Sequence, residues 1–159
     1  MADVEMQSDS DESPMEDYDE EIEKIKKKLL QDDRNISAAN TLLHLLKKNG
    51  DFEELDDKRK EFVEWAPLTA KNWVDWITDT IAKGQTPIEE IDKMFEKALF
   101  DENDVAIWVE RIFFAQKIDP ESCRKICELA LAAIGGRYDS GGHVWIIFLE
   151  YEREKLKSE

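Results

Sequence analysis

Cysteine, histidine and long apolar runs are scarce in this 159-residue sequence, and each shortage removes a class of protein. The two cysteines, four residues apart, are too few for a disulfide framework, so we expect core thiols in a reducing compartment. His44 sits within a leucine face, and His143 lies in a Gly-rich loop with no cysteine or carboxylate at ligand spacing, so no metal site is expected. No apolar run approaches the roughly 18 residues of a membrane span. Acid stands at the N-terminus where a signal peptide needs a basic and then an apolar region, so no secretory leader is expected.

Positive charge is absent from the start of the chain. Eleven of the 38 acidic residues lie in residues 1–23, which contain no Lys or Arg, and the rest of the chain is only mildly acidic. So charged a segment buries too little apolar surface to offset its ordering entropy, and residues 1–17 are predicted to form a disordered acidic tail. Acid repels the phosphate backbone, which disfavours nucleic-acid binding by this tail. The tail is either a solvating segment or an arm that attaches something basic.

Two serines of the tail are predicted phosphorylation sites. Ser8 precedes Asp11 by three residues, an acid-directed pattern, and Ser13 precedes Pro14, a proline-directed one. Each phosphate would add roughly 1.5 to 2 negative charges without touching the fold.

The sequence does contain a repeat. Residues 91–99 read I-D-K-M-F-E-K-A-L and return 32 residues later, in residues 123–131, as C-R-K-I-C-E-L-A-L. A fainter copy occupies residues 58–66, with Phe62 in the place of Phe95, and Leu55, Arg59 and Phe62 follow one another at helical spacing there. A period of this length indicates stacked helix hairpins. We therefore predict an all-α fold, a right-handed superhelical array of antiparallel hairpins over residues 18–159, with about three and a half hairpins and an incomplete C-terminal end.

Aromatic residues recur at one position of this repeat. The first helix of successive hairpins opens with Trp73, Trp108 and Trp145, which are 35 and 37 residues apart. A large ring at a recurring position usually acts as the packing wedge of a hairpin. The predicted repeat core comprises Trp73, Trp76, Phe95, Ala98, Leu99, Trp108, Ile126, Ala130, Leu131, Trp145 and Phe148. Trp65 and Trp76 are also candidates for partial exposure at a binding groove, where tryptophan is a favoured anchor.

Two details of the repeat resemble the half-a-tetratricopeptide (HAT) repeats of RNA-processing proteins. Residues 91–99 and 123–131 follow the second-helix pattern A-R-x-I-[YF]-E-R-A-L, and the first helix opens W-x-x-aromatic at Trp73 and Trp145. Arg111 stands where an aromatic is expected, which weakens one repeat. The resemblance extends to the U4/U6 small nuclear RNA particle recycling factors. It rests on two further stretches, the junction of the acidic tail with Y-D-E-E-I-E-K and the segment A-P-L-T-A-K-N-W.

The resemblance implies a non-catalytic protein-interaction scaffold for nuclear pre-mRNA splicing. The partners it implies are proteins of the spliceosomal particles, with ubiquitin-specific peptidases or histones as further candidates, and RNA association would be indirect, through domains that this sequence does not contain. No cofactor is expected. The alternative function is a chaperone of histones or other basic proteins that acts through the acidic tail.

The sequence contains no arrangement of residues that is typical of a catalytic site. Cys123 and Cys127 take the repeat positions of Ile91 and Phe95, which favours core packing over nucleophilic use. The segment G-G-R-Y-D-S-G-G lacks the G-K-[ST] ending of a phosphate-binding loop and is interpreted as a linker. Because the array ends without a partner helix for residues 145–149, an uncovered apolar patch and weak self-association are expected there.

Overall fold

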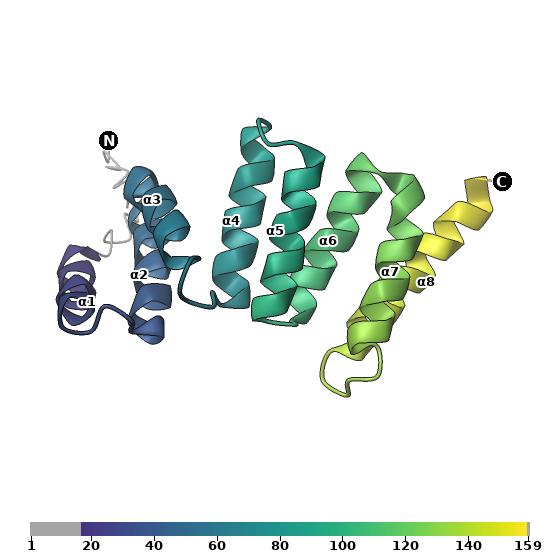
Figure 1. Cartoon of the computed structure of the whole chain (residues 1–159). Coiled ribbons are helices and arrows are strands. Elements are labelled where there is room, and N and C mark those ends of the chain that lie inside the picture. The colour runs from purple at the N-terminus through teal and green to yellow at the C-terminus, as the bar shows by residue number, and fades with distance from the viewer. Residues whose placement is uncertain (1–16, 159) are drawn as a thin grey trace, which may run out of the picture.

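The structure is a computed structural model that describes residues 17–158, and the regular secondary structure of this part of the chain is all α-helix (Figure 1). Its eight helices are α1 (Asp19–Gln31), α2 (Ile36–Asn49), α3 (Phe52–Phe62), α4 (Ala70–Lys83), α5 (Ile88–Asp101), α6 (Val105–Ile118), α7 (Pro120–Ile134) and α8 (Gly141–Ser158). The predicted all-α helical-repeat array is confirmed. Residues 1–16 of the predicted tail, with Ser8 and Ser13, lie outside the described residues. No helix within residues 17–158 has the length and apolar character needed to cross a membrane.

The helices are arranged as a row of hairpins. Consecutive helices pair as α2 with α3, α4 with α5, and α6 with α7, while α1 packs on α2 and α8 packs on both α6 and α7. The first helices of successive hairpins also touch, since α2 contacts α4, α4 contacts α6 and α6 contacts α8. Each hairpin is therefore held mainly by its neighbours in the row, as in other helical repeat proteins.

Local signals in the sequence set the helix ends. Asn35 caps α2 by accepting a hydrogen bond from the Ala38 amide at 2.9 Å, and Asp119 does the same for α7 with Pro120 at the first helical position. Gly50 and Gly84 end α2 and α4 with φ of 82° and 64°, a left-handed conformation that glycine adopts without strain.

The apolar interior consists of two clusters. The first extends from α1 to α6 and contains the fully buried Trp73 and Phe95. The second lies between α6, α7 and α8 and contains Trp108 and the buried Cys127. Leu99 packs against both clusters, so the core continues from one end of the described array to the other.

Candidate protein-interaction groove

The structure places the predicted repeat-core residues at three levels of burial. Five are buried, namely Trp73, Phe95, Ala98, Trp108 and Ala130. Five are partly buried, namely Trp76, Leu99, Ile126, Leu131 and Phe148. Trp145 departs from the expected wedge, because 47% of its surface is exposed.

The different place of Trp145 follows from the packing of α8. Val144, one residue earlier, is fully buried in the second cluster, and adjacent residues of a helix point about 100° apart. A close backbone approach sets this rotation, since a Cβ atom on Gly141 would collide with the carbonyl oxygen of Gly135. The Trp145 indole instead lies along the surface and donates to that Gly135 carbonyl at 3.1 Å.

Trp76 lies at a groove between α3, α4 and α5. The groove has a volume of about 530 Å³ and is lined by Asp56 and Lys60 of α3, by Trp73, Trp76, Thr80 and Lys83 of α4, by Glu90, Lys93, Met94 and Lys97 of α5, and by Thr86. The Trp76 ring stacks on Trp73 with centroids 5.3 Å apart and planes 14° apart. Trp73 is itself fixed, because its Nε1 donates to Asp101 at 2.9 Å. Trp76 therefore presents a partly exposed aromatic face on a fixed base.

The groove carries an excess of positive charge. Four of its lining residues are lysines, and two are acidic. Lys83 pairs with Asp56, and Lys97 lies 3.6 Å from Asp101. Within residues 17–158, neither Lys60 nor Lys93 has an ion-pair partner. The charge of Lys60 also helps to lower the pKa of Asp56, but neither ammonium group is held in an ion pair, so both can meet carboxylates of a bound molecule.

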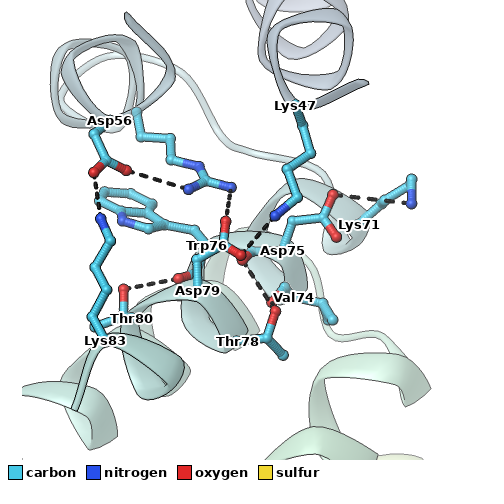
Figure 2. A network of polar contacts seen from close by, with 11 residues as sticks. Lys47, Asp56, Lys71, Val74, Asp75, Trp76, Thr78, Asp79, Thr80 and Lys83 are labelled. Atoms are coloured by element: carbon cyan, nitrogen blue, oxygen red, sulfur yellow. Dashed lines mark hydrogen bonds and ion pairs between the residues drawn. The ribbon is translucent and has the colours of Figure 1, made fainter. Parts of the chain in front are cut away.

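A network of ion pairs holds the wall of this groove (Figure 2). The carboxylate of Asp79 on α4 accepts from Lys47 of α2 at 2.6 Å and from the buried Arg59 of α3 at 3.0 Å. Asp56 accepts from Arg59 at 3.5 Å and from Lys83 at 2.5 Å. Five charged side chains thereby tie α2, α3 and α4 together, and Trp76 lies beside the Asp56–Lys83 end of the network.

The cations of the network keep Asp56 charged. Burial favours the neutral acid, but the hydrogen bond and charge of Lys83, together with the charge of Arg59, outweigh burial and lower the pKa of Asp56 below its usual range. The ion-pair network at the groove wall is therefore intact at neutral pH.

A second polar network joins the same two hairpins. The side-chain oxygen of Asn40 accepts from the Thr69 amide at 2.8 Å and from the Asn72 side chain at 2.9 Å. The side-chain nitrogen of Asn40 donates to the carbonyls of Ile36 and Pro67. This buried amide has all its hydrogen-bonding groups satisfied, as a stable buried polar group requires.

Sequence reasoning missed both networks. The available signals were Arg59 on an otherwise apolar helix face and Asn40 among buried leucines and alanines of α2. A polar residue at a core position indicates that a partner lies opposite, but the sequence does not say which one.

The cysteines lie in the second cluster, away from this groove. Cys123 and Cys127 are free and buried, and burial raises the pKa of the Cys127 thiol to about 12. A thiol with so high a pKa is a poor nucleophile at neutral pH. Among the described residues, no three His, Cys, Asp or Glu side chains are grouped so as to hold a metal ion.

Known proteins resemble this chain along most of its length. It is 55% identical over 167 residues to a protein of Caenorhabditis elegans named spliceosome associated factor 3, U4/U6 recycling protein, and the alignment covers 99% of this chain and 20% of that protein. The Homo sapiens protein of the same name is 29% identical over 139 residues, which are 83% of this chain and 14% of that protein. The chain thus spans about a fifth or less of the length of these relatives, and the expected resemblance to U4/U6 recycling factors is confirmed.

The family model of the Suppressor of forked protein (Suf) matches residues 20–155. This range runs from α1 into α8 and so includes all three hairpins. The chain therefore belongs to the Suppressor of forked protein family.

Proposed function

We propose that this chain is a non-catalytic protein-interaction scaffold in pre-mRNA splicing and that the groove beside Trp76 is one of its binding surfaces. The U4/U6 recycling proteins to which the chain is similar support the splicing context. The observation that carries the binding surface is the partly exposed Trp76, stacked on a fixed Trp73 and flanked by Lys60 and Lys93, which have no ion-pair partner among the described residues. Rigid aromatic anchors of this kind commonly dominate protein interfaces.

The proposed partners are protein components of the spliceosomal U4/U6 particle, and the proposed location is the nucleus. Ubiquitin-specific peptidases and histones are further proposed partners that the resemblance implies. RNA is proposed to associate indirectly, through other parts of a longer protein.

The test is retention of splicing proteins from nuclear extract by the immobilised full chain, measured by quantitative mass spectrometry. We expect the wild-type chain to retain U4/U6 proteins and Trp76→Ala/Lys93→Glu to lose them. The matched control is Lys125→Glu, which reverses an exposed charge on α7, away from the groove. Retention by the groove variant equal to wild type would remove the groove from the interface, whereas no splicing protein on the wild-type chain would remove the splicing role.

A second proposed function, chaperoning of basic proteins, is favoured by the eleven acids of residues 1–23. Replacing the acids of residues 1–16 by Asn and Gln should then abolish histone binding, while Trp76→Ala/Lys93→Glu should leave it unchanged. The reverse pattern would assign histone binding to the groove.

We also propose that the chain self-associates weakly through α8. Trp145, Ile146 and Leu149 are 47%, 58% and 61% exposed on this helix. Burying a side chain of this size is worth roughly 1.5–3 kcal/mol. Sedimentation at rising concentration should show association that Leu149→Asp suppresses. Phe148→Asp should also suppress it but is expected to destabilise the fold, because Phe148 packs partly against the second cluster. A wild-type chain that stays monomeric would overturn this proposal.

A further inference from the structure

The lysine groove is a positively charged site on a strongly acidic chain. The formal net charge of the chain is −16, yet four lysines surround Trp76 and Met94 in one groove. Lysine ammonium groups beside a partly exposed indole suit a segment that combines carboxylates with an apolar side chain. The surface therefore fits an acidic peptide.

An acidic segment of this chain leaves the fold near the start of α3, the helix that carries Asp56 and Lys60 of the groove. Asp19 at the start of α1 accepts from the Asn49 side chain at the end of α2 at 2.9 Å, and Lys48 lies 5.5 Å from the Tyr18 ring. Helix α3 begins at Phe52, directly after this point. The first groove residues on α3, Asp56 and Lys60, follow about 6–12 Å further along that helix at 1.5 Å per residue.

Residues 1–16 have the chemistry and the reach to fill the groove. They contain six acidic residues and no Lys or Arg. Met6 stands between Glu5 and Asp9 in sequence, and Met6 is eleven positions before Asp17, a separation of up to about 35 Å in an extended chain. A thioether also makes favourable contacts with an aromatic ring.

We propose that residues 1–16 bind intramolecularly in the Trp76 groove, with carboxylates against Lys60 and Lys93 and the Met6 side chain on Trp76. The inference rests on the groove being a binding surface, as proposed above, and is independent of which external partner uses it. Any external ligand of the groove then competes with the chain's own N-terminal segment.

Tethering favours this segment over a separate acidic molecule. Residues 1–16 contribute −6 of the net charge of −16, and the remaining −10 repels a free acidic peptide or a nucleic acid as well as residues 1–16, but only residues 1–16 are joined to the fold. A short covalent tether supplies an effective concentration in the ~mM range, so even a weak contact is populated. Among acidic ligands, residues 1–16 of the same chain are therefore the ones expected to bind the groove most readily.

The test is paramagnetic broadening within the full chain. A nitroxide is attached to Ser8→Cys, which reacts selectively because Cys123 and Cys127 are buried and burial raises their thiol pKa. We expect loss of the indole N–H signal of Trp76 and retention of the signal of Trp145, which lies on the last helix of the row. The Trp76 signal should return at about 1 M salt, where the Debye length falls to ~3 Å.

Two charge-reversed variants decide whether the groove is responsible. Lys60→Glu/Lys93→Glu should restore the Trp76 signal, and the matched double variant Lys117→Glu/Lys125→Glu, on α6 and α7, should leave it broadened. Broadening that persists in the groove variant, or that is equal at Trp76 and Trp145, would overturn the proposal.

Two mixtures identify the occupant. In the first mixture, one chain carries the isotope label and a second chain carries the nitroxide. The Trp76 signal of the isotope-labelled chain should be retained. Loss of that signal would show that the segment of a second copy occupies the groove. Adding short single-stranded RNA should leave the intramolecular broadening in place. Return of the Trp76 signal with RNA would show that phosphate displaces the segment, which overturns the choice of an acidic peptide. The extract experiment above measures retained splicing proteins, whereas this experiment measures broadening of the Trp76 signal within the purified chain, so the two proposals fail separately.

Discussion

Arg59 on α3 donates to Asp79 on α4 at 3.0 Å, and only 3% of the Arg59 side chain is exposed. The same carboxylate accepts from Lys47 on α2, so one acidic side chain joins both helices of the first hairpin to the first helix of the second. A buried arginine is stable only when its charge is compensated, and Asp56 and Asp79 supply two carboxylates. The junction between these hairpins therefore depends on charge as well as on apolar packing.

Removing this arginine should loosen that junction. Arg59→Met keeps most of the apolar volume and leaves Asp79 with Lys47 alone, so we expect a loss of about 1.5–3 kcal/mol, the range for hydrogen bonds to charged groups. The measurement is urea unfolding. Arg124→Met removes an exposed arginine that bridges Glu152 and Glu128, and it should cost less than about 1 kcal/mol. Equal effects of the two variants would show that burial of Arg59 adds nothing.

Two tryptophans at the same repeat position should differ in their contribution to stability. Trp108 is 7% exposed and its Nε1 donates to Asn103, whereas Trp145 is 47% exposed. Trp108→Ala should therefore lower the free energy of unfolding by about 3–5 kcal/mol, the range for emptying a large aromatic core site. Trp145→Ala should cost much less. Thermal unfolding of the two variants checks this order, and a small effect at Trp108 would contradict its role as a wedge.

The start of α8 should tolerate no side chain at Gly141. An added methyl group would meet the backbone of Gly135, which cannot rotate away, so Gly141→Ala should destabilise the fold by about 1–3 kcal/mol. Gly142→Ala is the matched control, because nothing lies within 4 Å of its added Cβ. Fluorescence of Trp145 should shift in the Gly141 variant alone if the rotation of α8 depends on this contact.

His44 should make the fold less stable in mild acid. Burial lowers the pKa of His44, and the positive charges of Lys48 and Lys71 add to this shift. Because the folded-state pKa lies below the unfolded value, the stability contribution is complete above about pH 6.5 and is lost as the pH falls through the folded-state pKa. His44→Gln should reduce this decline in urea unfolding between pH 7.5 and 5. His143→Gln, which leaves His44 in place, should keep it.

Phosphorylation should strengthen the proposed contact of the N-terminal segment with the groove. A phosphate on Ser8 or Ser13 adds roughly 1.5 to 2 negative charges opposite lysines. Mass spectrometry of the protein from its native cell should find both serines modified. In the nitroxide experiment the label then moves to Gln7→Cys, and the phosphorylated chain should keep Trp76 broadened to higher salt. An unmodified segment in the cell, or an unchanged salt response, would contradict the prediction.

The helical array follows from information that is local in the sequence. The cap at Asn35 and the glycine at Gly50 act within a few residues, and the helical pattern of residues 91–99 recurs in residues 123–131. The hairpins and their order are therefore readable without a structure. The burial of Trp73 and Phe95 can also be predicted from the sequence, because a large apolar residue that recurs at one position of a helical repeat is usually part of the core.

Tertiary packing alone decided which side chains on the apolar face of each helix point into the core and which charged side chains form ion pairs. A helical period defines a broad apolar stripe but not its rotation, and in α8 the approach of Gly141 to Gly135 buried Val144 and left Trp145 exposed. Ion pairs such as Arg59–Asp79 join residues 20 positions apart, and their geometry depends on how two hairpins stack. The sequence by itself thus determined the helices and their family, whereas the charged groove at Trp76 exists only because three helices bring their lysines together.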